Sequence, residues 1–276
     1  MKIVRTVEEV RSSLVGRVGL VPTMGAFHEG HLSLMRAARA KCDTLITSLF
    51  VNPTQFGPNE DFNRYPRNEE RDADLAAAEG VDLLFAPAVE TMYPDSPATI
   101  HVPAVTERWE GAIRPGHFDG VATVVCKLFN ITKADIAFFG EKDFQQCAVI
   151  AKMVRDLNID IALSFEPTIR EANGLAMSSR NQYLSQHERD IATVIYRMLC
   201  QTAALLERQA PCDKSVIDTF IAKAIATIES AGLQVDYFAL VDRDTLEPLS
   251  FLEQESRLIA AARLGQVRLI DNIRVL

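Results

Sequence analysis

The sequence predicts an α/β protein in which a large parallel sheet precedes a smaller α+β part. Through the first 168 residues, short apolar runs rich in β-branched residues alternate with amphipathic helical patterns. After residue 169 the texture changes, because two long helical stretches precede three strand-like runs. The length of 276 residues is sufficient for about two domains.

The first part, residues 1–168, shows strands alternating with helices, which indicates a Rossmann-like, doubly wound parallel sheet. The expected strands are residues 18–21, 44–51, 81–85, 135–139 and 160–165. The expected helices are residues 32–41, 69–79, 121–131 and 144–157. Between residues 86 and 120 the periodicity fails, and several prolines predict a long surface excursion of a length that is often functional.

The second part, residues 169–276, is predicted to be a smaller C-terminal α+β domain that acts as a lid. Its expected helices are residues 188–208 and 215–231, joined by a turn at residues 209–213. Its expected strands are residues 237–241, 258–262 and 267–270.

Composition excludes several classes of protein. The net charge of -8 disfavours nucleic acid as a partner, because affinity for phosphate backbones comes from clustered Lys and Arg. No apolar run reaches the roughly 18 residues of a membrane span. The five cysteines are scattered without a C-x-x-C pair, so neither a disulfide framework nor a zinc site is indicated. We therefore expect a cytoplasmic protein with no membrane partner.

The most specific segment is residues 21–31, VPTMGAFHEGH, which follows an expected strand and leads into a helix. A helix N-terminus presents unpaired N–H groups to an anion, and Gly25 and Gly30 permit close approach. His28 and His31 lie three residues apart and can reach the same phosphoryl oxygens. An ordinary pair of histidines is the plain alternative, and a zinc pair is a weaker one because it usually spans four residues and needs a third ligand.

A second segment, residues 177–181 (MSSRN), lies beyond the last expected strand of the sheet, with Gly174 nearby. Two hydroxyls and a guanidinium suit a clamp for a polyphosphate. Taken alone, such a segment is more often a solvated loop or a helix cap.

Together, H-x-G-H after the first strand and M-S-S-R after the last resemble the paired signatures of the HIGH/KMSKS nucleotidyltransferase superfamily, whose members attack the α-phosphorus of ATP. Further segments resemble the pantothenate synthetase family: FVNPTQF at 50–56, YPR at 65–67, RPGHF at 114–118, FGEKDFQQ at 139–146 and RLIDN at 268–272. The departures are small: Thr54 stands where the family often has methionine, and Glu171-Ala-Asn precedes Gly174 in place of a commoner charged pair.

The resemblance implies an ATP-dependent ligase of pantothenate and coenzyme A biosynthesis. Pantoate would be activated as pantoyl adenylate with release of pyrophosphate, and β-alanine would then displace AMP. Mg²⁺ is expected to accompany ATP on ligands that the sequence does not fix. No bound organic cofactor is expected, and family members are commonly homodimers.

The resemblance also implies site residues. His28, His31 and Lys142 would be catalytic, with His31 also a proton donor. A surface lysine in a polar turn is the weaker alternative for Lys142, because its position after a strand favours a functional role. ATP would be bound by Met24, Gly25, His28, Gly30, His31, Gly140, Glu141, Lys142, Asp143, Ile169, Met177, Ser178, Ser179 and Arg180. Pantoate would be bound by Gln55, Gln146, Asn52 and Tyr65, and β-alanine by Gln55.

Three other functions remain open at this point. An adenylyltransferase of the same superfamily, acting on a phosphorylated acceptor, would share H-x-G-H without needing Gln55 and Gln146. A truncated class I aminoacyl-tRNA synthetase would also form an acyl adenylate, but the acidic charge counts against it. A non-catalytic ATP-binding module would tolerate replacement of both histidines.

Overall fold

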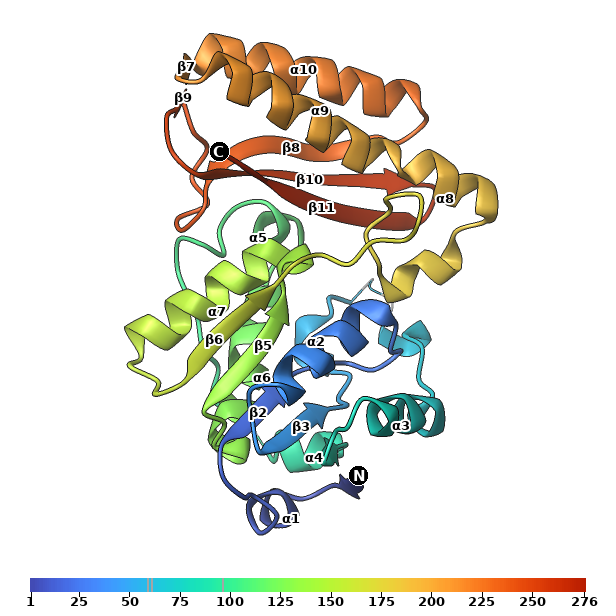
Figure 1. The fold of residues 1–276 in the computed structure, drawn as a ribbon, viewed down its shortest axis with the longest axis vertical. Helices are drawn as coiled ribbons and strands as arrows, with labels where there is room; N and C mark the ends of the chain where they lie inside the picture. Colours follow the sequence, from blue (N-terminus) through green and yellow to red (C-terminus); the bar gives the residue numbers. More distant parts are fainter. Residues whose placement is uncertain (59, 61, 96) are drawn as a thin grey trace. The chain divides into compact units, whose positions relative to one another are not determined.

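The computed structural model describes residues 1–58, 60, 62–95 and 97–276, and its contacts divide the chain into two compact units (Figure 1). Unit 1 comprises Met1–Glu141 with Gln145–Pro167. Unit 2 comprises Lys142–Phe144 with Thr168–Leu276. The short segment Lys142–Phe144 therefore packs with unit 2, although the expected boundary at residue 168 assigns it to the first part.

Unit 1 contains a six-stranded, all-parallel sheet in the order β1-β4-β3-β2-β5-β6. The strands are β1 Lys2–Val4, β2 Val18–Val21, β3 Thr44–Ser48, β4 Leu83–Phe85, β5 Ile136–Gly140 and β6 Ala162–Glu166. From β2 the chain proceeds to one side through β3 and β4, and later to the other side through β5 and β6. This reversal is the defining feature of a doubly wound sheet and confirms the predicted fold class.

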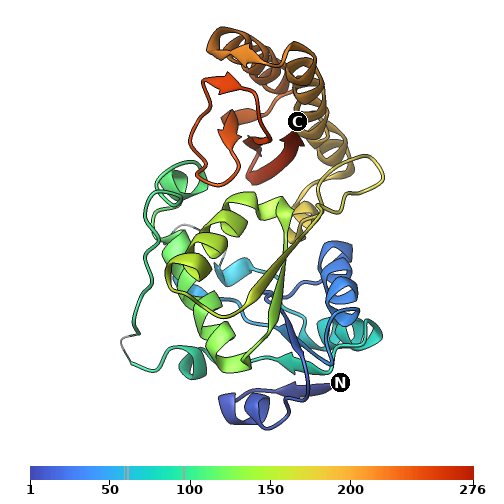
Figure 2. The same cartoon turned by 60° about the vertical axis from the view of Figure 1, so that its left-hand side comes forward.

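Helices cover both faces of this sheet. They are α1 Val7–Arg11, α2 Glu29–Arg39, α3 Glu69–Ala78, α4 Val89–Met92, α5 Glu110–Ile113, α6 His117–Thr132 and α7 Phe144–Asp156. Three short 3-10 turns are η1 Pro53–Gln55, η2 Phe62–Arg64 and η3 Glu141–Asp143. Figure 2 shows α2 and α3, in blue and teal, on one face, and α6 and α7, in green, on the other. Every residue of β2 and β3 is buried, as expected of strands covered on both faces.

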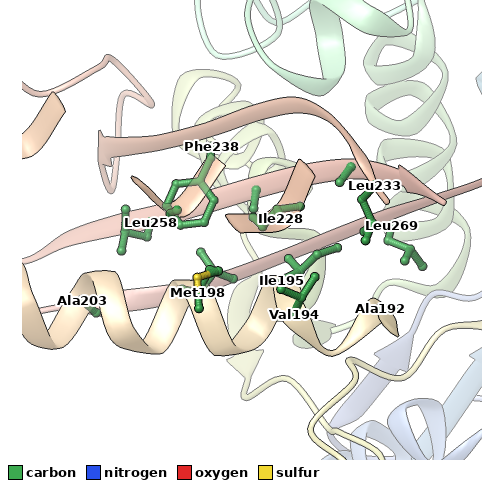
Figure 3. Packing of buried hydrophobic residues seen from close by; sticks show 14 of the residues in the cluster. Ala192, Val194, Ile195, Met198, Ala203, Ile228, Leu233, Phe238, Leu258 and Leu269 are labelled. Atoms are coloured by element: carbon green, nitrogen blue, oxygen red, sulfur yellow. The ribbon is translucent and has the colours of Figure 1, made fainter. Parts of the chain in front are cut away.

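Unit 2 contains a three-stranded antiparallel sheet in the order β11-β10-β8 and a two-stranded ribbon of β7 and β9. Its elements are η4 Ser179–Tyr183, α8 Gln186–Ala192, α9 Val194–Gln209, β7 Cys212–Asp213, α10 Lys214–Ser230, β8 Gln234–Asp242, β9 Phe251–Leu252, β10 Ser256–Leu264 and β11 Val267–Val275. Helices α9 and α10 pack on the three-stranded sheet. Between them lies an apolar core in which Met198, Ile228, Phe238 and Leu258 meet (Figure 3).

The structure corrects several predicted boundaries. The strand predicted at 44–51 ends at Ser48, because the chain turns into η1, where Asn52 is the N-cap and Pro53 cannot donate a ladder hydrogen bond. The excursion at 86–120 contains α4, α5 and the first turn of α6, while its Ser96 lies outside the described residues. The helix predicted at 188–208 is divided at Thr193.

Three short strands were not predicted: β1, β7 and β9. β1 has only three residues, and it is recognised only by its parallel pairing with β4. The predicted turn at 209–213 contains β7, which is identified by its pairing with β9. No helix in the described part of the chain is long and apolar enough to cross a membrane.

Candidate active site

A tight turn between β2 and α2 carries the predicted phosphate-binding segment. Gly25 and Ala26 both have left-handed backbones, with φ of +87° and +54°. Asp72, a buried residue of α3, accepts hydrogen bonds from the N–H groups of Ala26 at 2.7 Å and Phe27 at 2.9 Å. The φ of Gly25 is one that residues with a Cβ rarely adopt, and a Cβ there would also lie 3.0 Å from Asp72 Oδ2, so glycine is favoured at this position. The turn is therefore fixed just before the first histidine.

The two histidines cap the start of α2. His28 is the N-cap, and its Nδ1 accepts the N–H of Gly30 at 3.1 Å. His31 Nδ1 accepts the N–H of His28 at 3.4 Å, and the two ring centroids are 4.2 Å apart. Because Nδ1 is the acceptor in both rings, each neutral imidazole carries its proton on Nε2, which makes Nε2–H the donor. The spacing of the histidines had predicted this shared location.

A buried polar cluster forms where the chain leaves β3. Asn52 Nδ2 donates to Gln55 Oε1 at 3.2 Å and to the carbonyl of Gly120 at 3.1 Å. Gln55 Nε2 lies 2.9 Å from the sulfur of Met24, and Tyr93 donates its hydroxyl to Asn52 Oδ1 at 2.8 Å. Three predicted ligands, Met24, Asn52 and Gln55, are thus brought together in unit 1. A carboxamide cluster of this kind can pair with the hydroxyl and carboxylate groups of a small acid.

Close contact between η1 and α6 positions this cluster. A Cβ on Gly120 would lie 2.5 Å from the carbonyl oxygen of Thr54 and 2.7 Å from the backbone nitrogen of Gln55. Backbone atoms cannot move aside as a flexible side chain can, so glycine at 120 is required for the contact.

The RPGHF segment braces the carbonyl of Gln55. His117 Nδ1–H donates to that carbonyl at 2.8 Å, and Arg114 donates to it at 3.3 Å and to the nearby carboxylate of Glu60 at 2.6 Å. Arg114 also donates to His117 Nε2 at 3.0 Å. Burial, assisted by the charge of Arg114, lowers the pKa of His117 to about 4. Burial opposes ionisation of Glu60, but the hydrogen bonds and charge of Arg114 outweigh it and lower its pKa.

The two other predicted pantoate ligands, Tyr65 and Gln146, lie in different surroundings. Tyr65 is buried, and its ring meets that of Phe56 edge to face at 5.9 Å. Gln146 is half-buried on α7. Its neighbour Gln145 is buried and accepts the N–H of Glu110 at 2.9 Å while donating to two carbonyls of the same excursion. Gln145 therefore secures the excursion, while the role of Gln146 as a pantoate ligand stays a prediction.

The end of β5 carries the next predicted group. A Cβ on Gly140 would meet no atom within 4 Å, so there is open space above this residue. Glu141, Lys142 and Asp143 form η3, and Lys142 Nζ lies 3.2 Å from Asp143 Oδ1. The carbonyl of Lys142 accepts a hydrogen bond from Asn272 Nδ2 at 3.0 Å within unit 2. Lys142 is therefore held by its backbone as well as by its neighbour.

The predicted phosphate clamp in unit 2 follows a short hairpin. Met177 N–H donates to the carbonyl of Ile169 at 2.9 Å, and Gly174 forms the turn with φ of +96°. Ser178 caps η4, its hydroxyl accepting the N–H of Arg180 at 3.3 Å. The predicted alternative of a helix cap thus describes Ser178, and its O–H hydrogen can still be donated to a ligand.

Sequence reasoning missed three residues that position the predicted ligands: Asp72, Tyr93 and Gly120. Each acts through long-range contacts with the segments around Met24 and Gln55. An aspartate inside a helical pattern beside alanines was the available signal for Asp72, because a buried carboxylate requires partners.

The described residues contain no group of three or more His, Cys, Asp or Glu side chains arranged to hold a metal ion.

Comparisons with known proteins agree along the whole chain. Residues 2–274 match the family model of pantoate-beta-alanine ligase. The pantothenate synthetase of Rhizorhabdus wittichii is 52% identical over 283 residues, covering 100% of this chain and 99% of the relative. That of Moorella thermoacetica is 50% identical, covering 99% and 98%.

Solved structures give the same result. The pantothenate synthetase of Thermus thermophilus has a TM-score of 0.91 and 46% identity, covering 99% of both chains. The pantoate-beta-alanine ligase of Francisella tularensis, complexed with beta-gamma ATP and beta-alanine, has a TM-score of 0.81 and 37% identity, covering 99% of this chain and 97% of that one. On the family model, the relatives and the fold together, this chain is a member of the pantoate-beta-alanine ligase family.

Proposed function

We propose that this chain joins pantoate to β-alanine through a pantoyl adenylate, converting ATP to AMP and pyrophosphate. The ligase activity follows from the family. The intermediate and the roles of individual residues are the proposal. Its main support is the turn that places two Nε2–H donors at the N-terminus of α2, beside the cluster of Met24, Asn52 and Gln55.

Two steps are needed because a carboxylate is a poor electrophile. In the first, a pantoate carboxylate oxygen attacks the α-phosphorus of ATP, an O–P bond forms, and the bond to pyrophosphate breaks. In the second, the β-alanine amine attacks the acyl carbon, the bond to AMP breaks, and the amine loses a proton. Pantothenate, AMP and pyrophosphate are the products.

The histidines act on the first step. Negative charge grows on the α-phosphoryl and bridging oxygens as pyrophosphate leaves. Donors arranged in advance stabilise that charge, each by roughly 3–4 kcal/mol. His28 and His31 would supply such donors, because capping makes Nδ1 the acceptor and leaves the Nε2 hydrogen as the donor. Lys142 would add a positive charge. His31 is also the proposed proton donor, a role that requires its imidazolium form, which returns to the neutral Nε2–H or Nδ1–H ring after giving up one proton.

The remaining ligands divide by substrate. Gln55, Gln146, Asn52 and Tyr65 would bind pantoate, and Gln55 would also contact β-alanine. Backbone groups at Gly25, Gly30, Gly140 and Ile169, with the side chains of Met24, Glu141, Asp143 and Met177, would hold the nucleotide. Ser178, Ser179 and Arg180 would hold the β- and γ-phosphates. The Francisella relative, named with an ATP compound and β-alanine, supports these two substrates.

Three broader features are also proposed. Mg²⁺ would arrive on the ATP phosphates, where it neutralises the leaving pyrophosphate. The chain would work as a homodimer. It would work in the cytoplasm, where cysteines stay reduced, and the five cysteines form no disulfide in the described structure. An adenylyltransferase acting on a phosphorylated acceptor is not favoured, since the family match extends over residues 2–274.

The deciding experiment measures pantoate-dependent exchange of labelled pyrophosphate into ATP, with Mg²⁺ and without β-alanine. We expect exchange only when pantoate is present, and AMP in proportion to pantothenate once β-alanine is added. Exchange without pantoate, or pantothenate formation with no exchange, would refute the adenylate. A reaction lacking Mg²⁺ and one lacking protein are the controls.

A further inference from the structure

Strand β11 of unit 2 carries a buried charged residue, Asp271, within a row of apolar residues. In β11, Val267, Leu269, Ile273 and Val275 belong to or pack against the core under α9 and α10. Asp271 stands in the same alternating row, with its side chain 5% exposed. An apolar residue would continue this row at no electrostatic cost. The carboxylate therefore calls for an explanation other than core stability.

Asp271 has a specific partner at the base of the proposed phosphate clamp. Arg170 donates to both of its oxygens, at 2.6 and 2.9 Å. The same guanidinium lies 3.6 Å above the ring centroid of Tyr196 on α9 and donates to the carbonyl of Gly174 at 3.2 Å. The planar guanidinium group of Arg170 is therefore held in one orientation, because its edges donate hydrogen bonds and one of its faces stacks on an aromatic ring.

The hairpin anchored by Arg170 leads directly into the clamp. Arg170 and Ala176 form an antiparallel bridge, so the two arms of the hairpin are in register. Asn181, a buried residue, donates to the carbonyl of Ala176 at 3.0 Å and to Glu171 at 2.8 Å. Ser178 lies only two residues beyond Ala176, within about 7 Å of chain. A shift of Arg170 would therefore move Ser178–Arg180.

Asn272, the residue after Asp271, contacts the segment that carries Lys142, another predicted phosphate ligand. Adjacent residues of a strand point to opposite faces, so Asn272 leaves β11 on the side away from Asp271. Its Nδ2 donates to the carbonyl of Lys142 at 3.0 Å, and its backbone N–H donates to Asp271 Oδ1 at 2.8 Å. Two consecutive residues thus hold two segments that are far apart in the sequence.

We infer that Asp271 and Asn272 are positioning residues for ATP: Asp271, through Arg170, sets the clamp at Ser178–Arg180, and Asn272 sets the turn that carries Lys142. Neither residue needs to touch substrate. The inference rests on the proposed function, in which these two segments bind the phosphates. It assigns Asp271 and Asn272 of the RLIDN segment a task in nucleotide binding.

The test replaces the ion pair by apolar residues and measures pyrophosphate exchange. In R170M/D271L both charges are removed together, which avoids a lone buried charge and commonly preserves the fold. We expect a melting temperature close to that of the parent protein and a loss in kcat/KM for ATP of about 10- to 100-fold, because misplaced ligands cost rate. The KM for pantoate should stay within about twofold of the parent value, because the pantoate ligands are not displaced.

A second variant tests the role of Asn272, whose side chain leaves β11 on the face opposite to Asp271. Asn272→Ala removes the donor to Lys142 and should lower kcat/KM for ATP in the same selective way. D236N is the control, because Asp236 forms ion pairs within the same sheet, with Arg268 at 2.6 Å and Arg263 at 3.4 Å, and the inference gives it no part in positioning either phosphate segment. We expect D236N to keep the ATP kinetics of the parent protein.

The outcomes separate the two levels of proposal. Folded R170M/D271L and N272A with unchanged ATP kinetics would overturn the inference. If R170M/D271L does not fold, Arg170→Lys replaces it, since lysine keeps the charge but loses the fork, and an unchanged KM for ATP would again overturn the inference. Absence of pantoate-dependent exchange in the parent protein would instead refute the proposed function.

Discussion

At the scale of single residues, the protein uses histidine in two opposite ways. His28 and His31 accept backbone hydrogens at Nδ1 and present Nε2–H as the donor. His117 donates from Nδ1 to Gln55 and accepts at Nε2 from Arg114. The neighbouring backbone groups therefore decide the tautomer, and the tautomer decides the proposed role.

This difference predicts the behaviour of substitutions at His31. In His31→Asn, Oδ1 replaces the capping Nδ1, but the donor at the position of Nε2 is lost. In His31→Gln, the amide nitrogen replaces that donor. We expect H31N to lower the rate of pyrophosphate exchange roughly 100- to 1000-fold. H31Q should lose less of the exchange rate than H31N. Because glutamine does not titrate, the pH–rate profile of H31Q should lack the pH-dependent fall in rate that deprotonation of His31 causes in the parent protein. Equal losses in both variants would contradict the donor role.

His117 predicts a pH dependence of stability. Its folded pKa of about 4 lies below the ordinary value of 6.5, so the unfolded chain binds the proton first as the pH falls. The stability that its neutral form contributes is complete above pH 6.5 and is lost as the pH falls to about 4. The total is on the order of 3 kcal/mol.

Urea unfolding between pH 7 and 4 measures this effect. Asn reproduces Nδ1–H as a donor but does not titrate, so His117→Asn should remove the His117 part of the acid-induced loss. The difference in unfolding free energy between the two proteins isolates this residue from the carboxylates. A constant difference across the range would refute the lowered pKa.

At the scale of elements, contacts from neighbouring helices and segments hold the turns that carry the proposed ligands. The η1 turn is held by α6 through Gly120, by Arg114 and His117 at the carbonyl of Gln55, and by Tyr93 at Asn52. The α2 turn is held by Asp72 of α3. Helices that cover the sheet thus act as supports for loops at the ends of its strands.

Gly120→Ala tests this arrangement. Replacing glycine by alanine in a helix interior normally stabilises the helix by about 1 kcal/mol. Here its Cβ would collide with the backbone of Thr54 and Gln55. We expect lower stability and a KM for pantoate raised at least several-fold, with the KM for ATP little changed. Asn130→Ala, in the exposed last part of α6, is the control and should affect neither KM. Full pantoate affinity in G120A would show that η1 need not approach α6 so closely.

At the scale of the whole molecule, the two compact units contribute different proposed ligands. Unit 1 carries the histidines and the carboxamide cluster, while unit 2 carries Lys142 and the hairpin before Ser178. The lid role of unit 2 stays a prediction. The family assignment and the ligase activity concern the chain as a whole, because the match extends over residues 2–274.

The proposed homodimer gives a prediction at this scale. Light scattering coupled to size exclusion should give about twice the chain mass of 30.6 kDa. The mass should not fall on dilution across the concentrations used for assays. A mass equal to one chain would remove the dimer from the proposal without affecting the ligase chemistry.

The fold class and the main segments of the candidate site could be predicted from the sequence. Alternating strand and helix patterns are local, so strands β2 to β6 and the start of α2 were predictable within a few residues. The pairs that position the ligands join residues 46, 68 and 101 positions apart: Asp72 with Ala26, Asn52 with Gly120, and Arg170 with Asp271. Such pairs leave no periodic signal in the chain. Tertiary structure alone decided them, because a buried polar group is satisfied by whichever distant partner the packed strands and helices bring within hydrogen-bond reach.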